Sequence, residues 1–263
     1  MTIRRPTPTP AVRASSRVDR IASTADVAPA RVFLTAEWRH LLMVNFVVDP
    51  RVLEPLVPAG TELDLWEGRA YVSVVGFRFL NTWVCGIPVP FHQNFDEVNL
   101  RYYVCRRVGD GWRKGVAFVK EIVPRRAIAF VARRLYNENY VCLPMRSSIN
   151  VPGLVGYGWW HQGAWEGVSA FVTGQSYRPD TSSEETFITE HYWGYARQRD
   201  GSTVEYAVEH EPWRVWRCET PALACQVAQL YGDDFGPFLA TSPSSAFVAD
   251  GSAVVVRKGV RLR

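Results

Sequence analysis

The residues best suited to chemistry lie in one segment, 118–136, which reads FVKEIVPRRAIAFVARRLY. It holds Lys120, Glu121 and, after a proline, the adjacent pair Arg125 and Arg126. A lysine in an apolar environment has a lowered pKa, and its neutral amine can attack a carbonyl carbon. A glutamate held beside it can act as a general acid or base. Lys120 and Glu121 are therefore the candidate catalytic residues.

Each of these two residues also has an ordinary explanation. The segment before the proline alternates like a strand, so Lys120 is expected to share a face with Val116 and Phe118, and Glu121 to share the opposite face with Val123. A lysine can extend along a sheet edge to reach solvent, and a glutamate can serve a structural ion pair. The sequence leaves both possibilities open.

The two arginines suggest a different chemistry. A guanidinium stays protonated and cannot act as an amine nucleophile, but its planar fork binds a carboxylate or phosphate through two hydrogen bonds. Arg125 and Arg126 are therefore candidate ligand-binding residues. Because they are adjacent, we expect one of them to be a plain surface charge.

The histidines and cysteines show no metal-ligand spacing. The five His and five Cys include no H-x-x-x-H and no C-x-x-C, and the sequence has no Walker, Rossmann or G-x-S-x-G motif. We predict no metal and no cofactor. His92 is kept as a candidate ligand-binding residue, because its long loop PFHQNFDE also carries Asp96 and Glu97. Five unpaired cysteines favour reduced thiols and a cytoplasmic protein.

The elements that must position these residues are mostly strands. Alternating or apolar segments predict strands at 37–48, 69–80, 98–107, 112–123, 158–179, 192–217 and 245–262. Helix signals predict short helices at 49–58, 125–140 and 220–231. Many strands and few helices, with no break in composition, predict a mainly β (α+β) single domain over 32–263, built as a closed or strongly curved antiparallel sheet.

Charge and hydropathy argue against two classes of partner. The net charge of +4 comes entirely from residues 1–31, an Arg-rich segment that we expect to be a disordered leader. The remaining residues hold equal numbers of acidic and basic groups, so we expect no nucleic-acid binding. No apolar run approaches the ~20 residues of a membrane span, so we expect no membrane partner. A small-molecule ligand and a homo-oligomer remain possible partners.

The order of the motifs resembles the acetoacetate-decarboxylase-like superfamily, and within it the YqjF-like branch. The resemblance runs over residues 33–261 and rests on the motifs LLMVNFVVDPRVLEPLVPAGTELDLWEGRAYVSVVGF, IPVPF, NLRYYV, FVKEIVPRR, TEHYWGY, VEHEPWRVW and VADGSAVVVRKGVRL. It implies a single-domain antiparallel β-barrel or cone with flanking helices and an interior ligand cavity. In the decarboxylases of this superfamily a lysine forms a Schiff base with the substrate, and an adjacent lysine lowers its pKa.

This chain departs from that pattern at the reactive lysines. The Pro-Lys-Lys segment of the family falls on Pro124, Arg125 and Arg126. The substrate-binding arginine of the family falls on Arg39, and a family glutamate falls near Ser73. The resemblance therefore implies a cavity that binds a small anionic molecule through Arg39 and Arg125 or Arg126, without the ordinary Schiff base.

Two alternatives stay open. The protein could be a lyase in which Lys120 is a relocated nucleophile, which requires Lys120 to point into the cavity, within ~3.5 Å of a substrate carbonyl carbon. It could also be a scaffold or oligomerisation module whose interior is filled by its own aromatic side chains.

Overall fold

The strands of this protein join edge to edge into one sheet, in a computed structural model that describes residues 30–88, 93–125 and 139–262. The predicted leader, apart from its last two residues, lies outside these ranges, as do His92 and Arg126. The described strands are β1 (Val32–Val48), β2 (Glu62–Leu63), β3 (Ala70–Val84), β4 (Ile87–Pro88), β5 (Phe95–Val108), β6 (Gly111–Val123), β7 (Tyr140–Cys142), β8 (Met145–Ile149), β9 (Gly153–His161), β10 (Ala164–Tyr177), β11 (Trp193–Arg197), β12 (Thr203–His210), β13 (Val215–Ala224), β14 (Ser245–Arg257) and β15 (Val260–Arg261). The described helices are α1 (Pro50–Leu53), η2 (Glu54–Leu56), α3 (Glu184–Thr189), α4 (Val227–Tyr231), η3 (Asp233–Phe235) and α5 (Gly236–Leu239).

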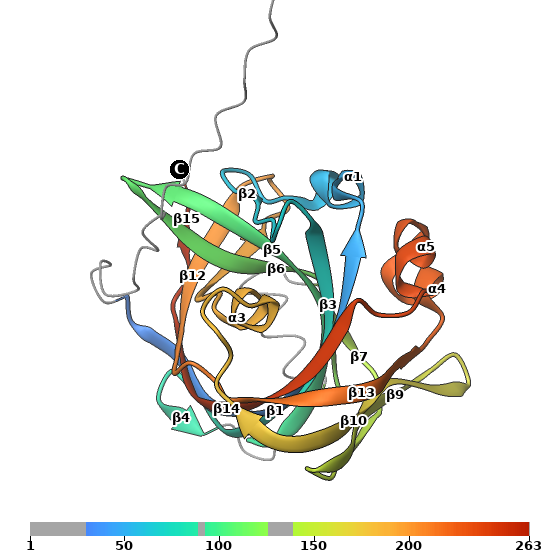
Figure 1. Cartoon of the computed structure of the whole chain (residues 1–263). Helices are drawn as coiled ribbons and strands as arrows, with labels where there is room; N and C mark the ends of the chain where they lie inside the picture. Colours follow the sequence, from blue (N-terminus) through green and yellow to red (C-terminus); the bar gives the residue numbers. More distant parts are fainter. Residues whose placement is uncertain (1–29, 89–92, 126–138, 263) are drawn as a thin grey trace, which may run out of the picture.

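Part of this sheet closes into a ring, seen end-on in Figure 1. Its strands follow the order β12, β11, β6, β5, β3, β1 and β14, and β12 pairs back onto β14, where Val208 lies opposite Val256. Neighbours in the ring are antiparallel except for β6 and β11, which are parallel. The predicted mainly β fold is confirmed, and the described sheet is antiparallel apart from this parallel seam and the short parallel pairing of β6 with β7.

Alternation along the ring strands separates an inner core from an outer one. In β5, Val98, Leu100 and Val104 pack in the outer core, whereas Phe95 and Tyr103 pack inside the ring. Successive side chains of a strand point to opposite faces, so one strand contributes to both cores.

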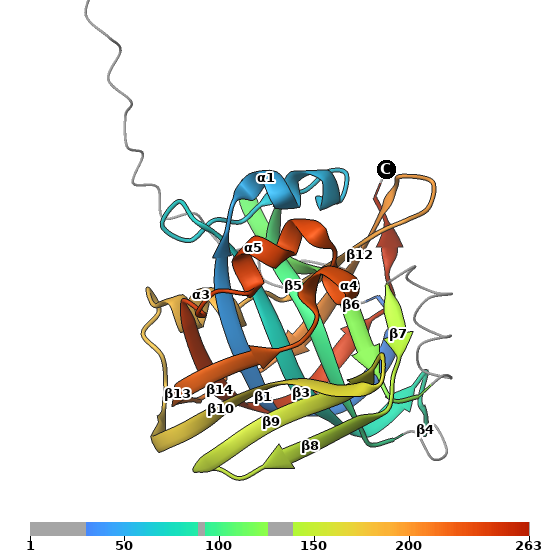
Figure 2. The same cartoon turned by 90° about the vertical axis from the view of Figure 1, so that its right-hand side faces the viewer.

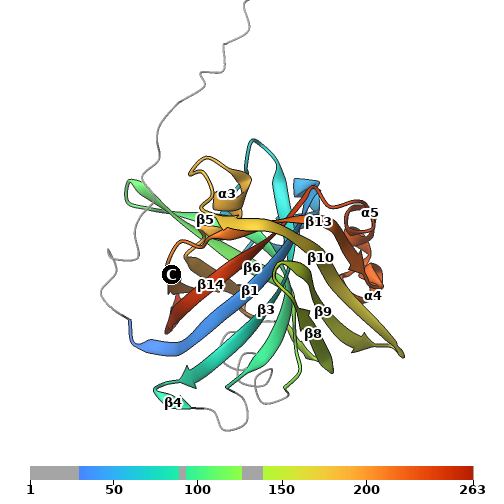
Figure 3. The same cartoon turned by 60° about the horizontal axis from the view of Figure 1, so that its bottom comes forward.

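A second layer covers the outside of the ring (Figures 2 and 3). From β14 the sheet continues through β13, β10 and β9 to β8, and α4 and α5 supply further side chains to the outer core. Tyr157 of β9 lies so close to β3 that a Cβ on Gly76 would come within 2.4 Å of its ring. The Tyr157 hydroxyl donates to the carbonyl oxygen of His40 at 2.8 Å. Glycine at position 76 thus allows the two layers to pack closely.

The short helices match the sequence only in part. Helix α1 begins as predicted after Asp49, whose side chain accepts a hydrogen bond from the Arg51 amide. The helix predicted from Thr220 is wrong over its first half, because β13 runs to Ala224 and α4 begins only at Val227. Pairing of β13 with β10 and β14 overrides the local helix signal there. The helix predicted at 125–140 falls mostly on 126–138, outside the described residues, and Tyr140 begins β7.

Helix α3, which the sequence reading missed, lies inside the outline of the ring in Figure 1. Ser183 caps it by accepting from the Thr186 amide, and two glutamates occupy its first turn. Its Ile188 is fully buried in the inner core. The helix therefore lies against the ring interior.

Candidate functional site

The ring encloses a cavity of about 240 Å³. Strands β1, β3, β5, β6, β12 and β14 and the segment from α3 to β11 contribute to its wall. The described residues that line it are Phe33, Leu34, Trp38, Leu41, Val75, Phe77, Phe79, Thr82, Val84, Phe95, Glu97, Asn99, Arg101, Val116, Phe118, Glu121, Tyr140, Thr189, His191, Trp193, Gly194, Tyr206, Val208, His210, Trp213 and Val256.

Most of the wall is aromatic or aliphatic. Trp38 forms edge contacts with Phe77, Phe79 and Trp213, with ring centroids 5.4, 5.8 and 6.4 Å apart. Phe79 in turn stacks on Phe95 at 4.6 Å. These rings form a rigid apolar surface that suits the hydrocarbon part of a ligand.

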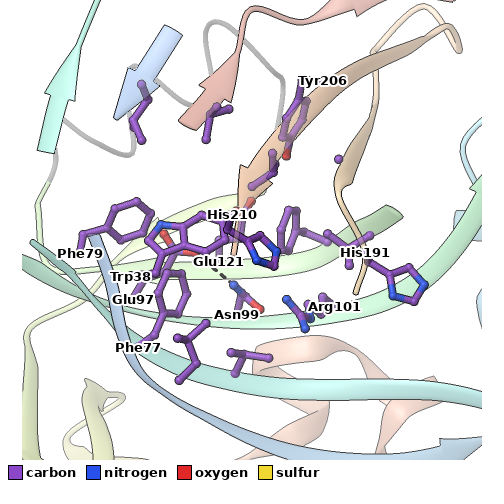
Figure 4. A pocket seen from close by; sticks show the side chains of 18 of the residues that line it. Trp38, Phe77, Phe79, Glu97, Asn99, Arg101, Glu121, His191, Tyr206 and His210 are labelled. Atoms are coloured by element: carbon purple, nitrogen blue, oxygen red, sulfur yellow. Dashed lines mark hydrogen bonds between the residues drawn. The ribbon is translucent and has the colours of Figure 1, made fainter. Parts of the chain in front are cut away.

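Polar side chains on β5 form a row along this wall. Glu97, Asn99 and Arg101 are all buried, and they occupy alternate positions of one strand (Figure 4). Asn99 Nδ2 donates to Glu97 Oε1 at 3.1 Å, and the Tyr140 hydroxyl donates to Glu97 Oε2 at 3.4 Å. The four-residue separation on an extended strand sets Glu97 and Arg101 about 13 Å apart along the chain. The cavity thus has an acidic end and a basic end.

Glu121 of β6 joins the acidic end, and a shift in strand register explains how. β5 and β6 change register between Leu100 and Arg101, so that Leu100 lies opposite Lys120 while Arg101 lies opposite Phe118. Glu121 lies opposite Asn99 and lines the cavity with Phe118. The prediction that Lys120 shares a face with Val116 and Phe118 is therefore wrong, since an extra residue in one strand reverses every side chain after it. Glu121 and Val123 do share a face, as predicted.

Lys120 does not reach the cavity wall. It pairs with Leu100, whose side chain belongs to the outer core, and it is not among the residues that line the cavity. Burial lowers the pKa of its amine. The other two lysines, also in the described part of the chain, lie elsewhere: Lys114 pairs with Asp64 at 3.1 Å, and Lys258 is exposed.

Arg101 forms the basic end of the cavity. Its Nη2 donates to the carbonyl oxygen of Ile188 at 2.9 Å, and its Nε donates to the Tyr103 hydroxyl at 3.4 Å. Only 9% of the residue is exposed. Within the described residues no carboxylate comes within ion-pair distance of its guanidinium, and Nη1 makes no hydrogen bond.

A chain of hydrogen bonds that begins at Tyr103 supports the side chain of Arg101. Tyr103 shares a hydrogen bond of 2.6 Å with Ser73, and Ser73 donates to Asn45 at 2.6 Å. Asn45 then donates to Ser245 at 2.9 Å. Because the single proton of Ser73 goes to Asn45, Tyr103 must donate to Ser73, which leaves a lone pair of its oxygen to accept from Arg101.

His210 reaches the cavity from β12 and its tautomer is fixed. Nδ1 lies 2.9 Å from the carbonyl oxygen of Glu211, which can only accept, so Nδ1 carries the proton. Burial lowers the pKa of His210 to about 4, and the charge of Arg101 adds to that effect. The ring also stacks on Trp213, with centroids 4.1 Å apart. At neutral pH the ring is uncharged and Nε2 is an acceptor.

His191 follows α3 and also lines the cavity. Its Nε2 lies 3.0 Å from Asp64, which also pairs with Lys114. Burial lowers the pKa of His191, so the neutral ring donates through Nε2, and Nδ1 has no hydrogen-bond partner among the described residues. The result is a buried imidazole oriented by a carboxylate.

The residues predicted to bind the ligand are not gathered at the cavity. Arg39 pairs with Glu37 at 2.9 Å and does not line the cavity, and Arg125 is exposed. Ser73 is buried, and it is connected to Arg101 only indirectly, because both residues form hydrogen bonds with the Tyr103 hydroxyl. Arg126 and His92 lie outside the described residues.

Sequence reasoning missed Arg101, Asn99 and His210. One signal was available for the first two: polar residues at 97, 99 and 101 alternate with apolar residues at 98, 100 and 102. In a closed sheet this pattern indicates a polar row on one face. The described residues contain no group of three His, Cys, Asp or Glu side chains that could hold a metal ion. Nor is any described helix fit to span a membrane, the longest having six residues.

The sequence matches a family of conserved proteins. Residues 35–253 match the family DUF2071, described as an uncharacterized conserved protein. The chain is also similar to the uncharacterized protein YqjF of Bacillus subtilis (strain 168), with 26% identity over 203 residues that cover 74% of this chain and 80% of that protein. The predicted resemblance to a YqjF-like branch is confirmed.

Solved structures share the fold. The chain is similar to an acetoacetate-decarboxylase-like enzyme from Sphingomonas wittichii RW1, with a TM-score of 0.62, 14% identity, and coverage of 92% of this chain and 98% of that one. It is also similar to the enduracididine biosynthesis enzyme MppR complexed with pyruvate, with a TM-score of 0.60, 14% identity, and coverage of 91% and 93%. At these identities the similarity concerns the fold alone, and it confirms the predicted architecture.

Proposed function

Since this chain belongs to the DUF2071 family and has the fold of acetoacetate-decarboxylase-like enzymes, we propose that its cavity binds a small organic molecule that bears a carboxylate. Arg101 binds the carboxylate, and the aromatic wall holds the hydrocarbon part. Glu121, at the acidic end, is the candidate for moving a proton.

The observation that carries this proposal is the buried guanidinium of Arg101 with its free Nη1. Burying a charge is costly unless it is paired, and a protein rarely retains such a group without a use. A carboxylate that accepts from Nη1 supplies the missing negative charge and a charge-assisted hydrogen bond. MppR, which shares the fold, forms a complex with pyruvate, and this supports a carboxylate as the ligand class here.

The size and lining of the cavity narrow the ligand further. A volume of about 240 Å³ is below the range of about 300–1,000 Å³ typical of sites for drug-sized ligands. Because the described wall is largely aromatic, a molecule with a short branched or aromatic hydrocarbon group fits it better than a sugar or a nucleotide. A monocarboxylic acid of a few carbons is the expected class.

Calorimetric titration of the purified protein at neutral pH tests this proposal. We expect pyruvate, acetoacetate or isovalerate to bind, and Arg101→Met to weaken the affinity by about tenfold or more, because a charge-assisted hydrogen bond contributes about 1.5–3 kcal/mol. Arg39→Met is the matched control, since Arg39 is paired with Glu37 outside the cavity. Unchanged affinity in Arg101→Met would rule the proposal out, and loss in Arg39→Met or Arg125→Ala would favour the arginines expected from the resemblance.

A second measurement tests the lyase alternative. None of the three lysines, all of them described, lines the cavity, and this supports binding over Schiff-base chemistry. We expect no covalent adduct on Lys120 after borohydride reduction with pyruvate or acetoacetate, measured by intact mass and peptide mapping. An adduct that maps to Lys120 and disappears in Lys120→Arg would revive the lyase alternative.

A further inference from the structure

Two hydrogen-bond acceptors without partners lie beside the basic end of the cavity. The first is Asn99, which is 3% exposed. Its Nδ2 must face Glu97, because a carboxylate oxygen accepts and an amide oxygen there would be repelled. Its Oδ1 is buried and has no hydrogen-bond partner among the described residues. A buried oxygen without a hydrogen-bond donor destabilises the protein, so a ligand that donates to this oxygen gains affinity.

The second acceptor is Nε2 of His210. Nδ1 is committed as a donor to Glu211, so Nε2 carries the lone pair of the neutral ring, and it has no hydrogen-bond partner within the described part of the chain. His210 and Arg101 lie on different strands of the ring, and both line the cavity. Figure 4 shows Asn99, Arg101 and His210 converging on one part of the cavity.

This end of the cavity thus presents one donor beside these two acceptors, and the unpartnered Nδ1 of His191 is a third acceptor among the described lining residues. From this arrangement we propose that the ligand is a hydroxy acid, whose carboxylate accepts from Arg101 Nη1 and whose neighbouring hydroxyl donates to His210 Nε2. His210 is then a specificity-determining residue. The inference rests on the proposed function, because it assigns the carboxylate to Arg101.

The same geometry disfavours the related acids. A 2-oxo acid places a carbonyl oxygen, which only accepts, against the two acceptors, and all three are then left unpaired. An acid with hydrogen at that carbon leaves both acceptors as they are in the empty cavity. An amino acid offers donors, but its ammonium brings a second positive charge beside the buried guanidinium. A site built to bind a hydroxyl group discriminates strongly against analogues that lack it.

Four acids that differ at one carbon provide the test: isovalerate and its 2-hydroxy, 2-oxo and 2-amino derivatives, with both enantiomers where they exist. Calorimetry at neutral pH is expected to show one enantiomer of the hydroxy acid binding about tenfold more tightly than isovalerate, and the oxo acid no more tightly than isovalerate. His210→Phe keeps a ring to stack on Trp213 but has no acceptor. It is expected to reduce the preference for the hydroxy acid over isovalerate, measured within the same variant, to about threefold or less.

A second variant guards against misfolding. His210→Gln offers an amide oxygen at about the same distance and is expected to restore part of the preference. Equal binding of isovalerate and its hydroxy derivative to the wild-type protein would overturn the inference and leave the proposed function standing. So would a preference that survives in His210→Phe. If no acid binds to the folded protein, or if Arg101→Met binds them all unchanged, the proposed function fails and the inference fails with it.

Discussion

Arg101 brings a permanent positive charge into an interior that is otherwise largely aromatic, and this has a consequence for stability. Its partners among the described residues are a carbonyl oxygen, a hydroxyl and, at 3.9 Å, the Met43 sulfur. Replacing a buried charge by a well-packed apolar side chain is often neutral or stabilising. The protein therefore retains Arg101 at some expense of stability, which is consistent with the proposed binding role.

We expect Arg101→Met to leave the free energy of unfolding of the empty protein unchanged or to raise it by about 1 kcal/mol. Arg113→Met is the contrasting variant, because Arg113 pairs with the buried Glu205 at 2.6 Å and lies over the Trp193 ring at 4.2 Å. Its loss is expected to lower that free energy by about 2 kcal/mol. Urea denaturation followed by tryptophan fluorescence measures both. Equal destabilisation by the two substitutions would mean that Arg101 is paired as firmly as Arg113.

His210 makes the stability of the protein depend on pH. Its pKa in the folded protein is about 4, against 6.5 for the ordinary side chain. The unfolded chain therefore binds the proton more readily, and the stabilising contribution, complete above pH 6.5, is lost as the pH falls towards 4. The difference corresponds to roughly 3 kcal/mol. We expect His210→Phe to lose less stability than the wild type between pH 7 and pH 4.5 in chemical denaturation. If the stability of the two proteins changed equally with pH, the pKa of His210 in the folded protein would be close to its ordinary value.

At the scale of the elements, the parallel seam between β6 and β11 depends on glycine. Gly115 lies opposite Trp193, and a Cβ on Gly115 would come within 2.5 Å of the Trp193 carbonyl oxygen. A backbone atom held in a seam cannot move aside as the end of a flexible side chain can. The ring closes at this seam only because residue 115 has no side chain.

Gly115→Ala is therefore expected to lower the free energy of unfolding by about 2–4 kcal/mol, because it forces two paired strands apart. Gly236→Ala is the matched control. No atom lies within 4 Å of a Cβ built on Gly236, which has ordinary helical backbone angles in α5, so its stability should change little. Thermal and urea denaturation of both variants would decide the question. An unchanged free energy of unfolding in Gly115→Ala would mean that β6 and β11 can move apart without loss of stability.

The strands could be predicted from the sequence, but the side to which each residue points could not always be. Alternation located β3, β5 and β6. The register shift opposite Leu100 then turned Glu121 inward and Lys120 away from the cavity wall. One extra residue in a strand cannot be recognised in an apolar segment, so the sequence could not show that Glu121, and not Lys120, shares the cavity face with Phe118. The helix predicted from Thr220 is wrong for another reason. A threonine followed by a proline is a local signal for a helix start, and it carries no information about the strands that pair with this segment.

At the scale of the whole molecule, the fold was predictable because the order of the motifs spans nearly the full length of the domain. The site was less predictable, because its residues come from strands far apart in the sequence. Arg101 on β5 and His210 on β12 meet only after the ring has closed. The arginines suggested by the aligned motifs are instead paired or exposed, as Arg39 and Arg125 are. Local patterns identify strands, but the contents of a cavity depend on tertiary pairing.

The pairing of β1 with β14 also constrains how the chain folds. Val32 lies opposite Arg257, so the first ring strand finds one of its two neighbours only near the far end of the chain. Bringing such distant segments together costs chain entropy before contacts between them can stabilise the pair. Proteins dominated by distant pairings therefore fold slowly, in about milliseconds to seconds. During synthesis β1 and β3 can pair early, but one edge of β1 stays open until β14 has left the ribosome. The cavity is therefore among the last features to form, and a newly made chain lacks it until β14 has been synthesised.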